Sequence, residues 1–336
     1  MKLIIQIPCF NEESTLPAVI RDLPKQIDGI DEIEIQVIDD GSTDRTSEVA
    51  ESLGVHHIVR FPHNRGLAAA FQGGVYNALL QGADILVNTD GDNQYKGEDI
   101  SKLVATMLEK HADVVIGCRP IAKHNEFSLF KKFLQRFGSW VVRMASNTDI
   151  PDATSGFRAY SRHALLRLNV VTDFSYCIET IIQSGQSNML VAHTPVRVNP
   201  KTRESRLYRN LPHYVFKQLQ TIIAIFILYR SNRFFGGLAA ILSFFALLLA
   251  GRYVFLVKFM GAPPSPTWPT VIFAGVLLTI ACLVYLVGTL ASLQAAQRKL
   301  AEETLYHLRC LNLIERAEGA GPFLRSAIFK GARLHE

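Results

Sequence analysis

Short apolar segments alternate with longer amphipathic segments along the first 120 residues of the chain. The apolar segments predict strands over residues 3–7, 34–39, 58–61, 85–88 and 114–117. The segments with helical spacing predict helices over residues 16–23, 44–53, 66–80 and 98–110. Strands that alternate with helices in this order indicate an α/β fold, in which a mainly parallel sheet is flanked by helices.

The alternation becomes less regular between residues 121 and 212. A basic, aromatic stretch predicts a helix over 127–146, and a polar loop is expected over 152–158. An apolar segment predicts a last strand over 191–198. The α/β domain is therefore expected to end near residue 210.

Two long apolar segments follow, and they indicate a protein attached to a membrane. At about 1.5 Å per residue, segments of this length cross a hydrocarbon core about 30 Å thick. The mixed segment before them is expected to lie along the membrane interface. The predicted organisation is an α/β domain over 1–210, an interfacial juxtamembrane helix over 211–233, transmembrane helices over 234–258 and 268–293, and a cytosolic amphipathic tail over 294–336.

The charge pattern supports this organisation and argues against a nucleic-acid-binding protein. The formal net charge is +5, and many basic residues lie between Lys201 and Arg233, directly before the first apolar segment. Basic residues in that place suit the anionic cytoplasmic leaflet better than DNA or RNA. Further basic residues follow the second apolar segment, so the positive-inside rule places the α/β domain and both termini in the cytoplasm. The tail is expected to be a packing element or a homo-oligomer contact.

The five cysteines are scattered along the chain without paired spacing. They form neither a disulfide framework nor a zinc motif, and they fit a reducing, cytosolic setting.

The strongest candidate for chemistry is the pair Asp90 and Asp92, which follows the predicted strand over 85–88. Carboxylates at the end of such a strand lie where an open α/β sheet binds its ligands. Alternation along the chain lets both side chains approach one point, and hard oxygen ligands suit Mg²⁺ or Mn²⁺. The alternative is an acidic surface turn, since Asp and Gly are ordinary turn residues.

Other acidic residues end neighbouring predicted strands. Glu12 and Glu13 follow the first strand, and Asp39 and Asp40 end the second. Each could belong to a plain turn or a helix cap. Together they would crowd like charges at one edge of the sheet, which is unfavourable unless a cation or hydrogen-bond donors balance them. This convergence favours a site for a metal ion and a nucleotide.

These motifs resemble the family 2 glycosyltransferases of the GT-A fold, a Rossmann-like fold. More specifically, they resemble the polyprenyl-phosphate branch typified by dolichol-phosphate mannose synthase. The matching segments lie in the same order and spacing over about 200 residues. They are Pro8-x-Phe10-Asn11-Glu12, Asp39-Asp40-Gly41-Ser42, Asn64-x-Gly66, Asp90-Gly91-Asp92-Asn93-Gln94, Gly117-Cys118-Arg119, Asp152-x-x-Ser155-Gly156-Phe157 and Glu204-Ser205-Arg206.

The resemblance implies a role for each matching residue. The nucleobase and ribose pocket would be lined by Pro8, Phe10, Glu12, Ile38 and Asp40. The divalent ion that bridges the donor diphosphate would be held by Asp90, Asp92 and Gln94, with Gly91 between the aspartates at the donor. The phosphate of the acceptor lipid would be received by Arg119 and Ser155. Phosphate charge would be clamped by Lys201, Arg203 and Arg206 on a mobile loop.

The resemblance also implies the reaction. An acceptor phosphate, with a second pKa near ~6, is already nucleophilic at neutral pH, so it needs no strong general base. Single displacement with inversion at the anomeric carbon would follow. Arg119 and Asp152 are candidate catalytic residues, and Asp152 is expected to orient rather than to deprotonate. Glu179 is a second candidate, about as well explained by a structural role.

The chain departs from the family pattern at four positions. Gly91 replaces the Ala that is usual between the two aspartates, which is a tolerable change. Phe10 replaces a frequent Tyr, which leaves uracil and guanine open as the donor base. Pro151 and Pro200 stand where mannose-type relatives often carry Arg. Arg143, Arg158 or Arg203 could supply that charge, so the sugar stays open.

The expected protein is therefore a membrane-anchored, metal-dependent, inverting glycosyltransferase. It would use a UDP- or GDP-sugar and a polyprenyl phosphate, either undecaprenyl or dolichyl. One alternative is transfer to another lipid or to a polysaccharide, although a polymerising synthase normally has more membrane spans. The other is a catalytically silent membrane protein that senses nucleotide sugars, against which the intact set of Asp90, Asp92 and Gln94 argues.

Overall fold

The structure is a computed structural model of the 336-residue chain. It describes residues 1–120, 142–143, 146, 148–170, 176–199, 211–261, 263 and 268–319, with the backbone alone over 211–230 and 314–319. Most of the helix predicted over 127–146 lies outside the described residues, as do Lys201, Arg203 and Arg206. The chain divides into two compact units, of which one is Met1–His213 with the segment from Glu302, and the other is Tyr214–Ala301.

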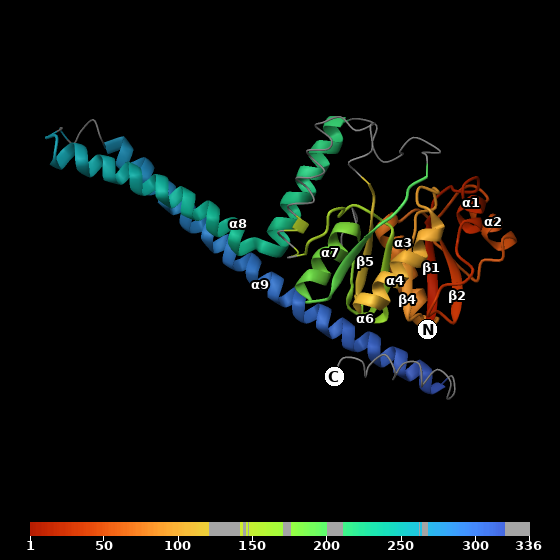
Figure 1. Ribbon diagram of the computed structural model, residues 1–336. Coiled ribbons are helices and arrows are strands. Elements are labelled where there is room, and N and C mark those ends of the chain that lie inside the picture. The colour runs from red at the N-terminus through yellow and green to blue at the C-terminus, as the bar shows by residue number, and fades with distance from the viewer. Residues whose placement is uncertain are drawn as a thin grey trace. The chain divides into compact units, whose positions relative to one another are not determined.

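The first unit is built on a twisted sheet in which seven strands are described (Figure 1). They are β1 (Lys2–Cys9), β2 (Glu32–Asp39), β3 (His57–Arg60), β4 (Ile85–Asn88), β5 (Val114–Cys118), β6 (Arg158–Ser161) and β7 (Val191–Pro195). Their order across the sheet is β3-β2-β1-β4-β6-β5-β7. Strand β6 runs antiparallel to both of its neighbours, and every other described pair is parallel.

Helices cover both faces of this sheet, as the strand–helix alternation predicts. They are α1 (Leu16–Arg21), α2 (Thr46–Ser52), α3 (Leu67–Leu80), α4 (Ile100–Lys110, after a 3₁₀ turn over Gly97–Asp99), α6 (Arg162–Arg167) and α7 (Tyr176–Gln186). Alternate residues of β1 explain the two layers. Leu3, Ile5 and Ile7 join a core cluster with α1, α2 and α4. Gln6 points to the opposite face and donates a hydrogen bond to the Phe71 carbonyl of α3.

The α3 face carries a row of buried amide side chains across the central strands. Gln36 Nε2 donates to Gln6 Oε1 at 2.9 Å, and Gln6 Nε2 donates to Asn88 Oδ1 at 3.0 Å. Helix α3 approaches this row so closely that a Cβ on Gly74 would lie 2.2 Å from Gln6 Oε1. Gly74 therefore serves close packing, and the satisfied amides fix how β2, β1 and β4 align beneath the site.

The segment after residue 150 is the part of this unit that the hydrophobic pattern predicts least well. β6, α6 and α7 were not predicted, because β6 is only four residues long and begins with a charged residue, Arg158. Arg158 is nevertheless fully buried. The strand predicted over 191–198 is present as β7, which ends at Pro195.

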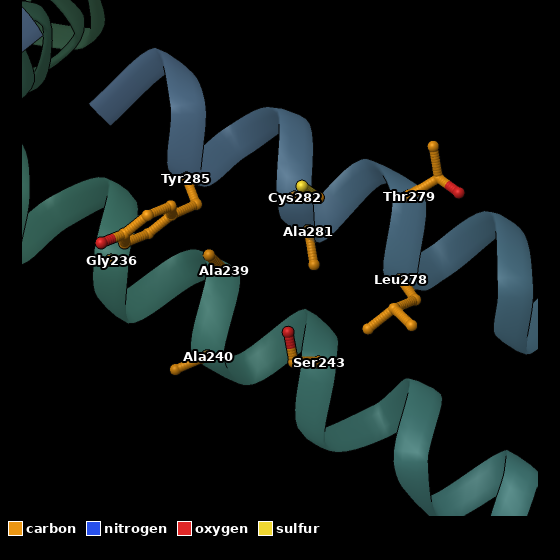
Figure 2. A pocket seen from close by; sticks show the side chains of 9 residues that line it. All are labelled: Gly236, Ala239, Ala240, Ser243, Leu278, Thr279, Ala281, Cys282 and Tyr285. Atoms are coloured by element: carbon orange, nitrogen blue, oxygen red, sulfur yellow. The ribbon is translucent and has the colours of Figure 1, made fainter. Parts of the chain in front are cut away.

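The second unit contains a helical hairpin. Helix α8 spans Leu211–Lys258, so the predicted interfacial helix and the first predicted transmembrane helix form one continuous helix. Helix α9 spans Trp268–Gly319, so the second predicted transmembrane helix continues into the predicted tail. By length and composition, Ser231–Lys258 and Trp268–Leu313 are each able to cross a membrane. Small residues let the two helices approach, and Figure 2 shows Ala239 and Ala281 between them. A Cβ on Gly288 would lie 2.7 Å from Phe235 Cβ, so this crossing requires glycine.

Candidate active site

The predicted site residues meet at one edge of the sheet. β1, β2, β4 and β5 all present their carboxyl ends there, and antiparallel β6 presents its beginning. Strand β1 lies between β2 and β4. The chain first continues from β1 to β2 and β3 on one side, and then returns to β4 on the other side of β1. In open α/β sheets, ligands bind at such a switch point.

Asp90 lies at the centre of this edge, against the loop before β6. A Cβ on Gly156 would lie 2.9 Å from Asp90 Oδ1, so the carboxylate rests on the glycine backbone. No described residue donates a hydrogen bond to it. Burial, with the charge of Asp92, raises the Asp90 pKa to about 7 even though Arg119 and Arg158 oppose the shift. A bound cation would favour the ionised form of this half-buried carboxylate, which its present surroundings disfavour.

The loop that holds Asp92 is fixed by its own backbone and by the chain after β7. The Gln94 N–H donates to Asp92 Oδ1 at 3.0 Å. Asn199 donates its N–H to the Gln94 carbonyl at 2.8 Å and its side-chain amide to the Asn93 carbonyl at 3.0 Å. The two predicted metal-binding aspartates therefore stand on a turn that is anchored at both ends.

The loop after β1 packs against the same turn. Thr15 Oγ1 lies within hydrogen-bond distance of two acceptors, the Gly91 carbonyl oxygen at 2.8 Å and Glu12 Oε2 at 2.7 Å. A Cβ on Gly91 would lie 3.1 Å from both Cys9 Sγ and the Pro8 carbonyl oxygen. Gly91 thus fits a space that Cys9 and the Pro8 carbonyl narrow.

The remaining residues of the predicted nucleoside pocket differ in what they expose. Phe10 is 38% exposed, whereas Ile38 is fully buried in β2, so the Ile38 side chain belongs to the core. Both Asp40 carboxylate oxygens accept backbone hydrogen bonds, from Arg65 N at 2.7 Å and Gly66 N at 2.9 Å. Asp40 therefore shapes the loop before α3.

Arg119 and Asp152 form a two-pronged ion pair, and the Arg119 charge lies close enough to Asp90 to oppose the rise of its pKa. Arg119 Nε donates to Asp152 Oδ2 at 2.8 Å, and Nη2 donates to Oδ1 at 3.0 Å. Burial alone would raise the Asp152 pKa, but the hydrogen bonds and charge of Arg119 lower it below its ordinary value. Asp152 is thus held ionised and fixes the guanidinium, which is what an orienting residue does.

Two further predicted residues are buried. The Ser155 side chain is fully buried, and its Oγ lies 3.4 Å from the Tyr95 hydroxyl. Glu179 lies in the first turn of α7, 3% exposed, and Oε1 accepts a hydrogen bond from Gln183 Nε2 at 3.2 Å. The structure therefore pairs Arg119 with Asp152 and brings the Arg119 charge near Asp90, while the side chains of Ser155 and Glu179 are buried.

Arg158 is not available to bind phosphate, so that alternative was wrong. Its guanidinium is fully buried and donates to backbone carbonyls at the start of α7 and in the loop before β6. It ties Ser155, Ala153 and Cys177 together. Arg143, the other described alternative, pairs with Asp149 at 3.4 Å.

Tyr95 and Tyr176 are site-shaping residues that the sequence did not single out. The Tyr95 hydroxyl accepts the Gly156 N–H at 3.3 Å, and the Tyr176 hydroxyl donates to the Gly156 carbonyl at 3.2 Å. Both rings thus hold the glycine on which Asp90 rests. The position of Tyr95, directly after Gln94, was the available indication for one of them.

The donor set fits a divalent ion that keeps sites for substrate. Among the residues described, no group of three or more His, Cys, Asp or Glu side chains could enclose a metal. Two carboxylates on one turn, one without hydrogen-bond donors, instead suit an ion that completes its shell with phosphate and water oxygens.

Comparison with known proteins identifies the family. The family model "Glycosyl transferase family 2" matches residues 4–168. An uncharacterized glycosyltransferase of Mycobacterium bovis is 31% identical over 59% of this chain and 85% of that protein. The chain belongs to glycosyl transferase family 2. This glycosyltransferase is also 28% identical to a dolichol-phosphate mannosyltransferase of Pyrococcus furiosus, over 76% of this chain and 70% of that protein.

Solved structures confirm the GT-A-like fold. Glucosyl-3-phosphoglycerate synthase of Mycobacterium tuberculosis, in complex with phosphoglyceric acid, matches with a TM-score of 0.52 and 21% identity, over 67% of this chain and 79% of that one. The same enzyme in complex with Mn²⁺, UDP and glucosyl-3-phosphoglycerate matches with a TM-score of 0.50 and 20% identity, over 67% and 78%.

Proposed function

We propose that this glycosyltransferase moves one sugar from a nucleotide-sugar donor to a polyprenyl phosphate, with inversion, at the cytoplasmic face of a membrane. The observation that carries the proposal is the arrangement around Asp90. Asp90 shares its turn with a second carboxylate, Asp92, which suits a cation, and the charge of the Arg119–Asp152 pair, which suits a phosphate, acts on the same carboxylate.

The donor diphosphate would bind at the turn of Asp90 and Asp92, with Mg²⁺ or Mn²⁺ held by these residues and Gln94. When bound, the ion neutralises charge that develops on the departing nucleotide. The nucleoside would lie towards Pro8, Phe10, Glu12 and Asp40, with Phe10 as the side chain most exposed for stacking. The Mn²⁺ and UDP bound by glucosyl-3-phosphoglycerate synthase support this division of the site.

The acceptor phosphate would bind at Arg119. Asp152 occupies Nε and Nη2 of that guanidinium, while Nη1 donates no hydrogen bond to a described residue. Because Asp152 stays ionised, it holds Arg119 in place and accepts no proton at neutral pH. The acceptor phosphate supplies its own nucleophilic oxygen, so the reaction needs no other base. Ser155, Lys201, Arg203 and Arg206 remain candidates for further phosphate contacts.

The membrane hairpin fits an acceptor whose headgroup stays at the interface. Ser231–Lys258 and Trp268–Leu313 are long and apolar enough to span, and basic residues flank both outer ends. The positive-inside rule then keeps the catalytic unit and both termini in the cytoplasm. The name of the Pyrococcus furiosus relative, a dolichol-phosphate mannosyltransferase, supports an acceptor of this class.

The test is transfer by membranes that contain the full chain. Labelled UDP- and GDP-sugars are supplied one at a time with polyprenyl phosphate, and the organic phase is analysed for lipid-linked sugar. The proposal expects label from one donor to enter the lipid phase in a mild-acid-labile, phosphate-linked form. Label that enters only a diacylglycerol or a water-soluble polymer would contradict the acceptor, and no product with any donor would favour a sensor.

A further inference from the structure

The end of α9 forms an extra contact with the catalytic unit. From Glu302 onwards, the helix belongs to the same compact unit as the sheet. Its less exposed residues recur with helical spacing along one face, and they are Glu302, Leu305, Tyr306, Arg309, Cys310 and Leu313. This stripe, here called the tail face, packs where α6 ends.

Arg309 makes the central contact of the tail face. Its Nη1 donates to the carbonyl oxygen of Leu166, in the last turn of α6, at 3.1 Å and to that of Leu168, directly after the helix, at 2.8 Å. No described carboxylate pairs with Arg309, and burial lowers its pKa. A cation at these orphan carbonyls caps the helix end and fixes the chain that follows it.

Arg167 adds a second grip beside Arg309. Its guanidinium lies over the Tyr306 ring, 4.5 Å from the centroid, and Nη1 lies 3.4 Å from Glu303 Oε2. From the other side, Nε donates to His163 Nε2 at 3.0 Å. The tail face therefore holds α6 by a stacked cation and by a capping cation.

The segment that Arg309 contacts is hydrogen-bonded to α7. Asn169 N donates to Gln183 Oε1 at 2.9 Å, and Gln183 Nε2 donates back to the Asn169 carbonyl at 2.6 Å. The same Gln183 Nε2 donates to Glu179 Oε1 at 3.2 Å. A continuous hydrogen-bonded path thus runs from the capped end of α6 to a candidate residue of the active site.

We propose that the tail face is a latch, in which Arg309 acts as a positioning residue for α7 through Asn169 and Gln183. Helix α7 supplies Glu179, the Tyr176 hydroxyl at Gly156 and the Cys177 carbonyl that binds Arg158. A latch on α7 therefore reaches Asp90 through the contact of Tyr176 with Gly156. The catalytic consequence rests on the proposed function; the structural coupling does not.

The experiment uses the full chain in detergent micelles and compares Arg309→Gln with Lys299→Gln, an exposed lysine of the same helix. Hydrogen exchange is followed over 165–170 and 176–186. We expect Arg309→Gln to raise exchange there about tenfold, while β1 and β4 keep wild-type protection. Arg309→Lys keeps a cation at the carbonyls, so it should restore most of the protection. Lys299→Gln should leave exchange unchanged.

The kinetic arm tests positioning. Arg309→Gln should lower kcat for transfer to polyprenyl phosphate about tenfold or more, because small misplacements behind a site are costly. Binding of Mn²⁺ alone, followed by EPR, should stay within about twofold, since the turn of Asp90 and Asp92 is held by other contacts. Gln183→Met should reproduce the loss, and the double variant should lose little more than either single variant.

Unchanged exchange over 165–170 and 176–186 in Arg309→Gln would overturn the latch. A uniform rise across all strands would also overturn it, because Arg309 would then support the whole fold rather than α7. If the wild-type chain transfers no sugar to any polyprenyl phosphate, the proposed function fails, and the exchange measurement still decides the latch.

Discussion

Gly156 and Asp90 are in direct contact: any Cβ at position 156 would lie 2.9 Å from Asp90 Oδ1 and 3.2 Å from Oδ2. The loop before β6 and the turn after β4 thus share one surface, and the carboxylate orientation depends on a residue 66 positions away in the sequence. Tyr95 and Tyr176 hold that glycine from both sides.

Gly156→Ala should therefore displace the Asp90 carboxylate. We expect transfer activity to fall about 10- to 100-fold, because a displacement near 1 Å at a reacting site has an effect of that size. Mn²⁺ affinity, measured by EPR, should fall with it. Gly275→Ala, at a glycine with open space around it, is the matched control. Full activity and Mn²⁺ affinity in Gly156→Ala would show that Asp90 tolerates another position.

Gly91 and Cys9 should be energetically coupled. Gly91→Ala inserts a methyl group 3.1 Å from Cys9 Sγ, so we expect it to destabilise the chain by about 1–3 kcal/mol. In the Cys9→Ala background, the same substitution should cost about 0.5–1 kcal/mol less. Thermal unfolding of the four chains in detergent measures the coupling. Additive effects would mean that the Pro8 carbonyl, rather than the sulfur, limits the space.

Arg119 and Asp152 should act on the acceptor and not on the donor. Asp152→Asn keeps the shape but removes the charge that fixes the guanidinium, and Arg119→Lys removes the fork. For each, we expect the acceptor KM to rise about tenfold or more, with the donor KM within about twofold. Because the pKa of Asp152 is lowered, its carboxylate stays ionised at neutral pH and also at a pH equal to the ordinary pKa of an aspartate. The pH dependence of the transfer rate tests this role. If the wild-type rate rose with pH around an apparent pKa near 7, and this rise disappeared in Asp152→Asn, Asp152 would instead be a general base.

Asp99 should govern acid stability. It is fully buried and accepts hydrogen bonds from Arg197, at 2.6 Å from the backbone N and 2.7 Å from Nη2. Burial by itself would raise the pKa of Asp99. Arg197 and Lys102 lower it by more than burial raises it, so the pKa lies below its ordinary value. A carboxyl group whose pKa is lower in the folded chain stabilises the fold when the pH is above its unfolded pKa of about 3.9. This stabilisation is lost as the pH falls through the folded pKa.

Asp99→Asn is therefore expected to cost about 1.5–3 kcal/mol at pH 7, and progressively less below pH 4. Thermal unfolding at both pH values measures this, with exposed Asp28→Asn as the control. An equal loss at pH 7 and at pH 3 would mean that the charge of Asp99 contributes nothing.

The central strands could be predicted from sequence because they are buried on both faces. β4 reads Ile-Leu-Val-Asn, and a continuous apolar run next to Asp90 leaves little alternative to a strand that ends at a site. β6 could not be predicted, because Arg158 begins it and the carbonyls that satisfy its charge come from Ala153, Ser155 and Cys177. A buried arginine is recognisable only when those partners are placed.

The same limit applies to the site. Asp90, Asp92 and Arg119 follow strands, so topology alone predicts that they meet at one edge. The pairing of Arg119 with Asp152, and the support of Asp90 by Gly156, depend on loops whose path the hydrophobic pattern does not encode. The roles of the individual residues stay predictions.

The most direct test of the central claim is the rate of transfer to polyprenyl phosphate by the purified full chain after removal of divalent ions. The account predicts that chelation lowers the rate about 100-fold or more, that Mn²⁺ or Mg²⁺ restores it, and that Asp90→Asn cannot be restored. An unchanged rate in excess chelator, together with full activity of Asp90→Asn, would contradict it.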